Sequence, residues 1–159
     1  MNQYSFENNQ LKFKVSKTPF LVRLVLFIIT FLCFAFPLFG IIFNIVEGNG
    51  IKFGGILAFG IFYLLGFYLL RISLWNSYGE ETIQINENKI IYIADYRWFK
   101  DGKKTIEKNG VTYSIKPVGY EEENNGILVI SNGKSEIESA VKIPKKNLEK
   151  LISIIQNEI

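Results

Sequence analysis

Carboxylates are the side chains of this 159-residue chain best suited to catalysis. Glu80 and Glu81 stand together, Asp95 ends a strand-like run, and Glu121–Glu123 form an acidic triplet. Paired carboxylates act as general acid and base only where they converge and their pKa values are shifted apart. Their spacing predicts no such convergence, and the triplet has the composition of a solvated loop. A membrane enzyme that uses Asp95 and Glu80 is one alternative.

Other catalytic groups are scarce. The sequence contains no His and a single Cys, Cys33, which lies inside an apolar run. The commonest general base is therefore absent, and a Cys/His zinc site cannot form. No glycine-rich phosphate-binding loop of the Walker type is present. We expect a protein that is not an enzyme and that uses no cofactor or metal.

The most distinctive polar segment extends from Arg97 to Lys116 and carries six basic residues against two acidic ones. Each Lys or Arg close to an anionic cytoplasmic leaflet contributes about 1 kcal/mol of attraction. Trp98 and Phe99 would enter the headgroups or anchor a partner; the alternative is a solvated hairpin with Trp98 in the core. The candidate contacts with a protein partner or with lipid headgroups are Arg97, Trp98, Lys100, Lys103 and Lys104.

Two apolar stretches must position these residues. Leu24–Val46 and Phe53–Leu70 contain no Asp, Glu, Lys or Arg. As helices they would be about 34 Å and 27 Å long, which matches a bilayer core of about 30 Å. The sequence therefore predicts a transmembrane helical hairpin over residues 20–75. The alternative, two buried core helices of a soluble protein, conflicts with the small size of the chain.

Basic residues near the ends of the spans predict the orientation of the hairpin. The connecting loop holds only Lys52, whereas the flanks are richer in Lys and Arg. This bias favours both termini in the cytoplasm and a multi-pass protein of the cytoplasmic membrane. The flanking basic residues are Lys12, Lys14, Lys17 and Arg23 before the hairpin, and Arg71 and Arg97 after it.

Gly54 and Ala58 form a small-xxx-small pair in the second apolar stretch. Such pairs let helix backbones approach closely in a membrane. The short loop favours packing within the hairpin, and the alternative is a homo-oligomer.

Residues 76–159 change to short strand-like runs separated by turns, with Asp101-Gly102 among the turn signals. A helix then follows Pro144, and we expect its apolar face to cover the sheet, with the membrane surface as the alternative. The face consists of Leu148, Leu151, Ile152, Ile155 and Ile159.

The leader, residues 1–19, alternates apolar and polar residues over Leu11–Val15. This period of two predicts a strand that pairs with the β-domain. A frayed basic tail is the alternative.

Six or seven short strands followed by one amphipathic helix resemble a pleckstrin-homology-like domain. Glu80–Ile85 would be its first strand, and Val141–Ile152 is similar to its junction between last strand and helix. Behind a two-helix hairpin, this order looks like bacterial membrane proteins with such domains. The resemblance implies an α+β fold, a small antiparallel barrel or sandwich closed by the C-terminal helix. It implies a scaffold more than a catalyst, and it carries over no binding residue.

We therefore expect a non-enzymatic, membrane-anchored binding or scaffold protein whose cytoplasmic β-domain contacts a protein or anionic lipid headgroups. One alternative is an immunity protein against a membrane-active toxin, and another is an accessory subunit of a membrane complex. Nucleic acid is not an expected partner, because the basic segment is short and tethered to the membrane.

Overall fold

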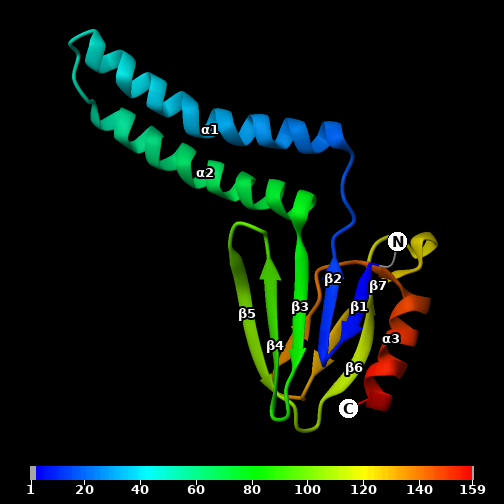
Figure 1. Ribbon diagram of the computed structural model, residues 1–159. Coiled ribbons are helices and arrows are strands. Elements are labelled where there is room, and N and C mark those ends of the chain that lie inside the picture. The colour runs from blue at the N-terminus through cyan, green and yellow to red at the C-terminus, as the bar shows by residue number, and fades with distance from the viewer. Residues whose placement is uncertain (1–2, 159) are drawn as a thin grey trace. The chain divides into compact units, whose positions relative to one another are not determined.

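Two long helices form the apolar part of the chain in the computed structural model, which describes residues 3–158 (Figure 1). They are α1 (Phe20–Val46) and α2 (Phe53–Tyr78), and both are long and apolar enough to cross a membrane. Core helices of a soluble protein are mostly buried, whereas Phe39 is 68% exposed here and Leu64 is 76% exposed. The helical hairpin expected from the sequence is therefore present.

The two helices approach each other at Gly66. A Cβ atom at this position would lie 3.0 Å from the Phe34 ring. Thr30 Oγ1 and Ser73 Oγ lie 3.3 Å apart in the same hairpin, and each hydroxyl also donates to a carbonyl of its own helix. A small residue and interhelical hydroxyl contacts are typical means of packing helices in lipid.

The chain divides into two compact units. One contains the hairpin, Lys17–Ser77, and the other, called the β-domain below, combines Met1–Ser16 with Tyr78–Ile159. The hairpin is thus inserted between two neighbouring strands of one sheet. β2 (Gln10–Lys14) precedes it and β3 (Glu80–Ile85) follows it.

The first sheet of the β-domain is antiparallel, with strands in the order β1-β2-β3-β4-β5. Leu11 and Phe13 of β2 pair with Ile83 and Glu81 of β3, and both leader side chains are fully buried. The predicted pairing of the leader with the β-domain is therefore confirmed. Its remaining strands are β1 (Tyr4–Glu7), β4 (Lys89–Asp95) and β5 (Lys100–Glu107).

The second sheet has the strand order β6-β7-β8, with β9 also paired to β7. These strands are β6 (Thr112–Pro117), β7 (Asn125–Ser131), β8 (Glu136–Glu138) and β9 (Ile143–Pro144), and the short 3-10 helix η1 (Glu121–Glu123) lies between β6 and β7. The antiparallel sheets expected from the sequence are present as two separate sheets. They do not close into a single hydrogen-bonded barrel within the described residues.

The C-terminal helix α3 (Lys145–Glu158) contacts β6, β7 and β9. Leu148, Leu151 and Ile155 are fully buried, as the helical spacing predicts. The expectation that the apolar face covers the sheet is confirmed for these residues. Ile152 is half-buried, and Ile159 lies outside the described residues.

One predicted turn is wrong. Asp101-Gly102 lies inside β5, and the chain reverses instead at Tyr96–Phe99. Gly102 has φ +65°, and the β4–β5 register shifts between Tyr92 and Ala94. The glycine therefore serves a β-bulge, in which a positive φ is also required.

Candidate functional site

The tip of the β4–β5 hairpin holds Trp98 and Phe99, the two aromatic residues for which a contact with lipid or a partner was predicted. The Tyr96 N–H donates to the Phe99 carbonyl across 3.0 Å, and the two rings stack 4.8 Å apart. Between them, Arg97 has φ +75°, and its N–H donates to the Asp95 carboxylate at 2.7 Å. The side-chain acceptor of Asp95 stabilises a turn that has no glycine. Trp98 is 69% exposed at this tip, so the alternative that places it in the core is wrong.

The tip lies at the end of the sheet where the chain arrives from α2. Glu80, the first residue of β3, lies opposite Asp95, the last residue of β4. The Arg97 guanidinium carbon is 4.6 Å from the ring centroid of Tyr78, the last residue of α2. This is cation–π distance, and it holds the turn against Tyr78, which belongs to the β-domain.

The lysines of the candidate site follow along β5, an edge strand of the first sheet. Lys100 Nζ lies 3.3 Å from Asp95 Oδ2, so part of its charge is offset. Lys103 and Lys104 are exposed and come after the bulge at Gly102. The structure therefore brings Arg97, Trp98 and Lys100 together at the turn, with Lys103 and Lys104 further along the same strand. Their contact with lipid or protein stays a prediction.

Gly54 and Ala58 border a cavity of about 290 Å³ in the helical hairpin, together with Pro37, Gly40 and Asn44. A Cβ atom at Gly54 would meet nothing within 4 Å. The close-packed glycine is Gly66, which the sequence analysis did not single out. The use of Gly54 and Ala58 in packing stays a prediction.

Two of the carboxylates considered for catalysis are half-buried and pair with lysines. Glu80 Oε2 lies 3.8 Å from Lys14 Nζ, and Asp95 bonds Lys100 and the turn backbone. Through these contacts, both carboxylates stabilise the end of the first sheet. Among residues 3–158, no cluster of three or more His, Cys, Asp or Glu is placed to hold a metal ion.

Glu81 differs from its neighbour because its side chain is fully buried. One carboxylate oxygen accepts hydrogen bonds from the Ala140 N–H at 2.6 Å and the Tyr92 hydroxyl at 2.9 Å. The other oxygen accepts a longer bond from the Val141 N–H at 3.4 Å. Glu81 thereby joins β3 of the first sheet to the β8–β9 connection of the second. The strand alternation Glu81-Ile83-Ile85 was the available signal for its burial.

Burial raises the pKa of the Glu81 carboxyl, while its three hydrogen bonds oppose the rise. Burial and the adjacent Glu81 charge also raise the pKa of Tyr92, so this phenol keeps its proton and remains a donor. The bonding pattern is that of a structural link between sheets, because the carboxylate is fully buried and its partners come from both sheets.

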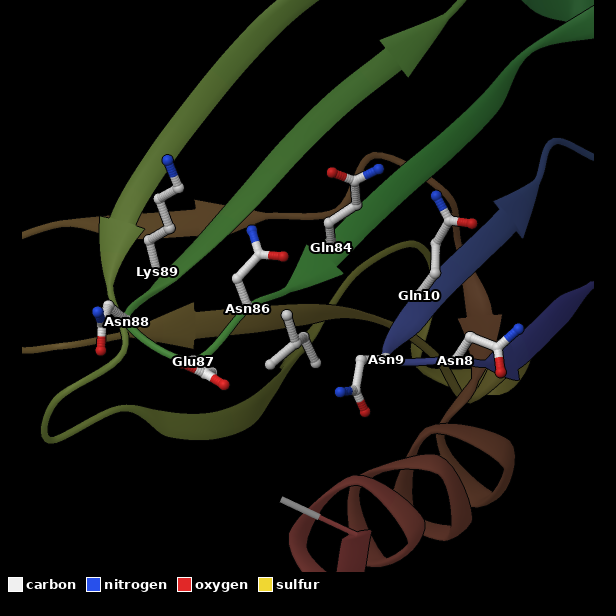
Figure 2. Close-up of a pocket in the computed structure, with 9 residues that line it drawn as sticks. Asn8, Asn9, Gln10, Gln84, Asn86, Glu87, Asn88 and Lys89 are labelled. Atoms are coloured by element: carbon white, nitrogen blue, oxygen red, sulfur yellow. The ribbon is translucent and has the colours of Figure 1, made fainter.

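A second concave feature was missed by the sequence analysis. The β1–β2 turn at Asn8-Asn9 and the β3–β4 turn at Asn86–Asn88 border an open hollow of about 770 Å³ (Figure 2). Pairing of β2 with β3 sets Gln10 directly opposite Gln84 in this hollow. We call this feature the amide hollow. Segments far apart in the sequence build it, and only the pairing of the leader brings them together.

Comparisons with known proteins add no family. No protein-family model matches the chain, and no curated protein or solved structure is detectably similar to it. The function must therefore be argued from the geometry of the site.

Proposed function

We propose that this chain is a non-enzymatic, membrane-anchored binding protein whose β-domain contacts anionic lipid headgroups through the β4–β5 tip. The observation that carries this proposal is the exposure of Trp98 in a turn whose Arg97 lies over Tyr78, the residue of the β-domain that directly follows the apolar hairpin in the chain. A largely exposed Trp in water forfeits the burial of a large apolar surface. At a membrane interface, its apolar ring and polar N–H are both satisfied.

Charge supports the same contact. Lys100, Lys103 and Lys104 follow the tip on β5, and each would contribute about 1 kcal/mol near an anionic leaflet. The two covalent connections are short, because Gly79 alone separates α2 from β3 and residues 15–19 separate β2 from α1. In this proposal the hairpin spans the cytoplasmic membrane and both termini are cytoplasmic.

The proposal includes a pleckstrin-homology-like fold for the β-domain. Two antiparallel sheets followed by a C-terminal helix support this assignment. The two leader strands would then be an addition to the first sheet, because they precede the strand that opens the domain. A domain of this kind would serve as a binding scaffold, with the membrane hairpin inserted in the chain between β2 and β3.

Fluorescence of Trp98 tests the headgroup contact. The chain has two Trp residues, so Trp75→Phe leaves Trp98 as the sole emitter. The full chain is reconstituted in vesicles with and without anionic phosphatidylglycerol, each with brominated acyl chains as quencher. We expect stronger quenching in the anionic vesicles. The triple variant Lys100→Gln, Lys103→Gln and Lys104→Gln should reduce it.

A matched triple variant elsewhere in the β-domain controls for net charge. Lys142, Lys146 and Lys150 are also exposed, and their replacement by Gln should leave the quenching unchanged. Equal emission from Trp98 in brominated and unbrominated anionic vesicles would remove the lipid contact. Burial of Trp98 in native membranes but not in vesicles would instead indicate a protein partner.

A further inference from the structure

The amide hollow lies at the opposite end of the first sheet from the β4–β5 tip. β3 begins at Glu80, opposite Asp95, and ends at Ile85, opposite Ile90, beside the hollow. A ligand in the hollow would therefore not compete with the proposed headgroup contact. Binding at the hollow goes beyond the proposed function and is independent of it.

Carboxamides dominate the lining of the hollow. None of these side chains has a hydrogen-bond partner among residues 3–158, although each offers two donors and an acceptor. The hairpin turn explains two of them, because Asn8 and Asn9 have φ +50° and +58°, which Asn tolerates. Asn86 and Asn88 belong to the β3–β4 turn, which the Asn86 N–H closes by donating to the Lys89 carbonyl. Gln10 and Gln84 lie in strands, and no turn explains them. The six carboxamides belong to Asn8, Asn9, Gln10, Gln84, Asn86 and Asn88.

Several of these carboxamides point the same way, so their hydrogen-bond donors and acceptors lie on one side of the sheet. Figure 2 shows Gln10, Gln84 and Asn86 projecting toward the same side of the sheet, with Lys89 beside them. Gln10 and Gln84 are half-buried, so their chains are partly held by their surroundings. A ligand on this side would meet donors and acceptors from three positions on two connected segments.

The charge and shape of the hollow limit the class of ligand. Its lining carries one cation, Lys89, and one anion, Glu87, so it has no net charge to select a phosphate or a carboxylate. The lining contains no aromatic side chain on which a nucleobase would stack. β2 and β3 are each paired on both sides, so an extended peptide cannot add to them as a strand.

A hydroxyl-rich neutral molecule satisfies these conditions, since each hydroxyl both donates and accepts a hydrogen bond. The volume of about 770 Å³ lies within the range of small-molecule sites. We propose that the amide hollow binds a neutral sugar or polyol through Gln10, Gln84 and Asn86. The affinity should be modest, because hydrogen bonds replace those already made to water.

Side-chain amide resonances report this binding directly. The isotope-labelled full chain in lipid nanodiscs is titrated with glucose, N-acetylglucosamine and trehalose, and separately with inorganic phosphate. We expect saturable shifts of the Gln10 and Gln84 NH2 signals with at least one sugar and none with phosphate. The NH2 signal of Asn132, which donates to a backbone carbonyl elsewhere, should not move.

Variants separate a site from general solvent effects. Gln10→Thr with Gln84→Thr keeps residues suited to strands and should weaken the sugar affinity about tenfold, judged from the remaining Asn86 signal. Gln156→Ala, an exposed carboxamide on α3, is the control and should bind as the parent does. Shifts that never saturate, an affinity unchanged by the double substitution, or an equal response to phosphate would each overturn the proposal.

Discussion

Replacement of the buried carboxylate of Glu81 provides a sharp test of how the two sheets are joined. Glu81→Met removes both oxygen acceptors while nearly keeping the length of the side chain. The Ala140 N–H and the Tyr92 hydroxyl, which bond Glu81 at 2.6 and 2.9 Å, then lose their acceptor inside the protein. Each buried donor left without a partner costs about 1–3 kcal/mol. We expect a loss of roughly 2–6 kcal/mol, offset in part because no carboxylate must be buried.

Glu81→Gln is the matched variant. Its remaining oxygen can accept both short bonds, and only the 3.4 Å bond from Val141 becomes a contact between donors. We expect it to cost about 1 kcal/mol. Urea unfolding of the full chain in detergent, followed by the β-sheet signal in circular dichroism, measures both variants. A Glu81→Met protein as stable as the parent would refute the reasoning, because the buried donors would then need no acceptor.

The pH dependence of the free energy of unfolding tests the direction in which the Glu81 pKa is shifted. Burial raises the pKa of Glu81 in the folded protein above its ordinary value of 4.5. The folded state therefore holds the Glu81 proton more tightly than the unfolded state does. The stability that this proton contributes is fully present below pH 4.5, and it is lost as the pH rises through the pKa of Glu81 in the folded protein. The stability difference between parent and Glu81→Gln should shrink as pH rises over this window. A difference that grows with pH would contradict the assigned direction.

Three further substitutions test the packing. Gly66→Val should weaken the association of the two helices, because a Cβ at this position would lie 3.0 Å from the Phe34 ring. Gly60→Ala is the control, since a Cβ there would meet nothing within 4 Å. The yield of crosslinks between the two helices compares the two variants. Phe13→Ala should destabilise the β-domain by about 3–5 kcal/mol in urea unfolding, and a frayed leader would show no effect. Gly102→Ala should cost about 1–2 kcal/mol because φ is +65° there, and an unchanged urea midpoint would contradict the bulge.

Periodicity in the sequence was sufficient for the elements with one strong pattern. Uninterrupted apolar runs predicted the hairpin, and the alternation of the leader predicted its pairing with the β-domain. The helical spacing of Leu148, Leu151 and Ile155 predicted the face that α3 buries. Each of these patterns lies within one element and identifies the face of that element that becomes buried.

Features that depend on pairing between distant segments were beyond such reasoning. Asp101-Gly102 is a frequent turn dipeptide, but the Asp95 carboxylate stabilises a turn at Arg97, and the glycine then serves a bulge. The amide hollow requires the register that sets Gln10 against Gln84, which lie on either side of the inserted helical hairpin in the chain. Two of the three partners of Glu81 lie 59 and 60 residues away along the chain, so its link to the second sheet follows only from the fold.

Labelling of single cysteines measures the membrane arrangement most directly. In a Cys33→Ser background, which removes the only native thiol, Asn49→Cys marks the α1–α2 loop and Lys134→Cys marks the β-domain. A membrane-impermeant maleimide is applied to intact spheroplasts and to lysed membranes. We predict that position 49 reacts in both samples and that position 134 reacts only after lysis. Reaction of position 134 in intact spheroplasts would contradict a β-domain held at the cytoplasmic face.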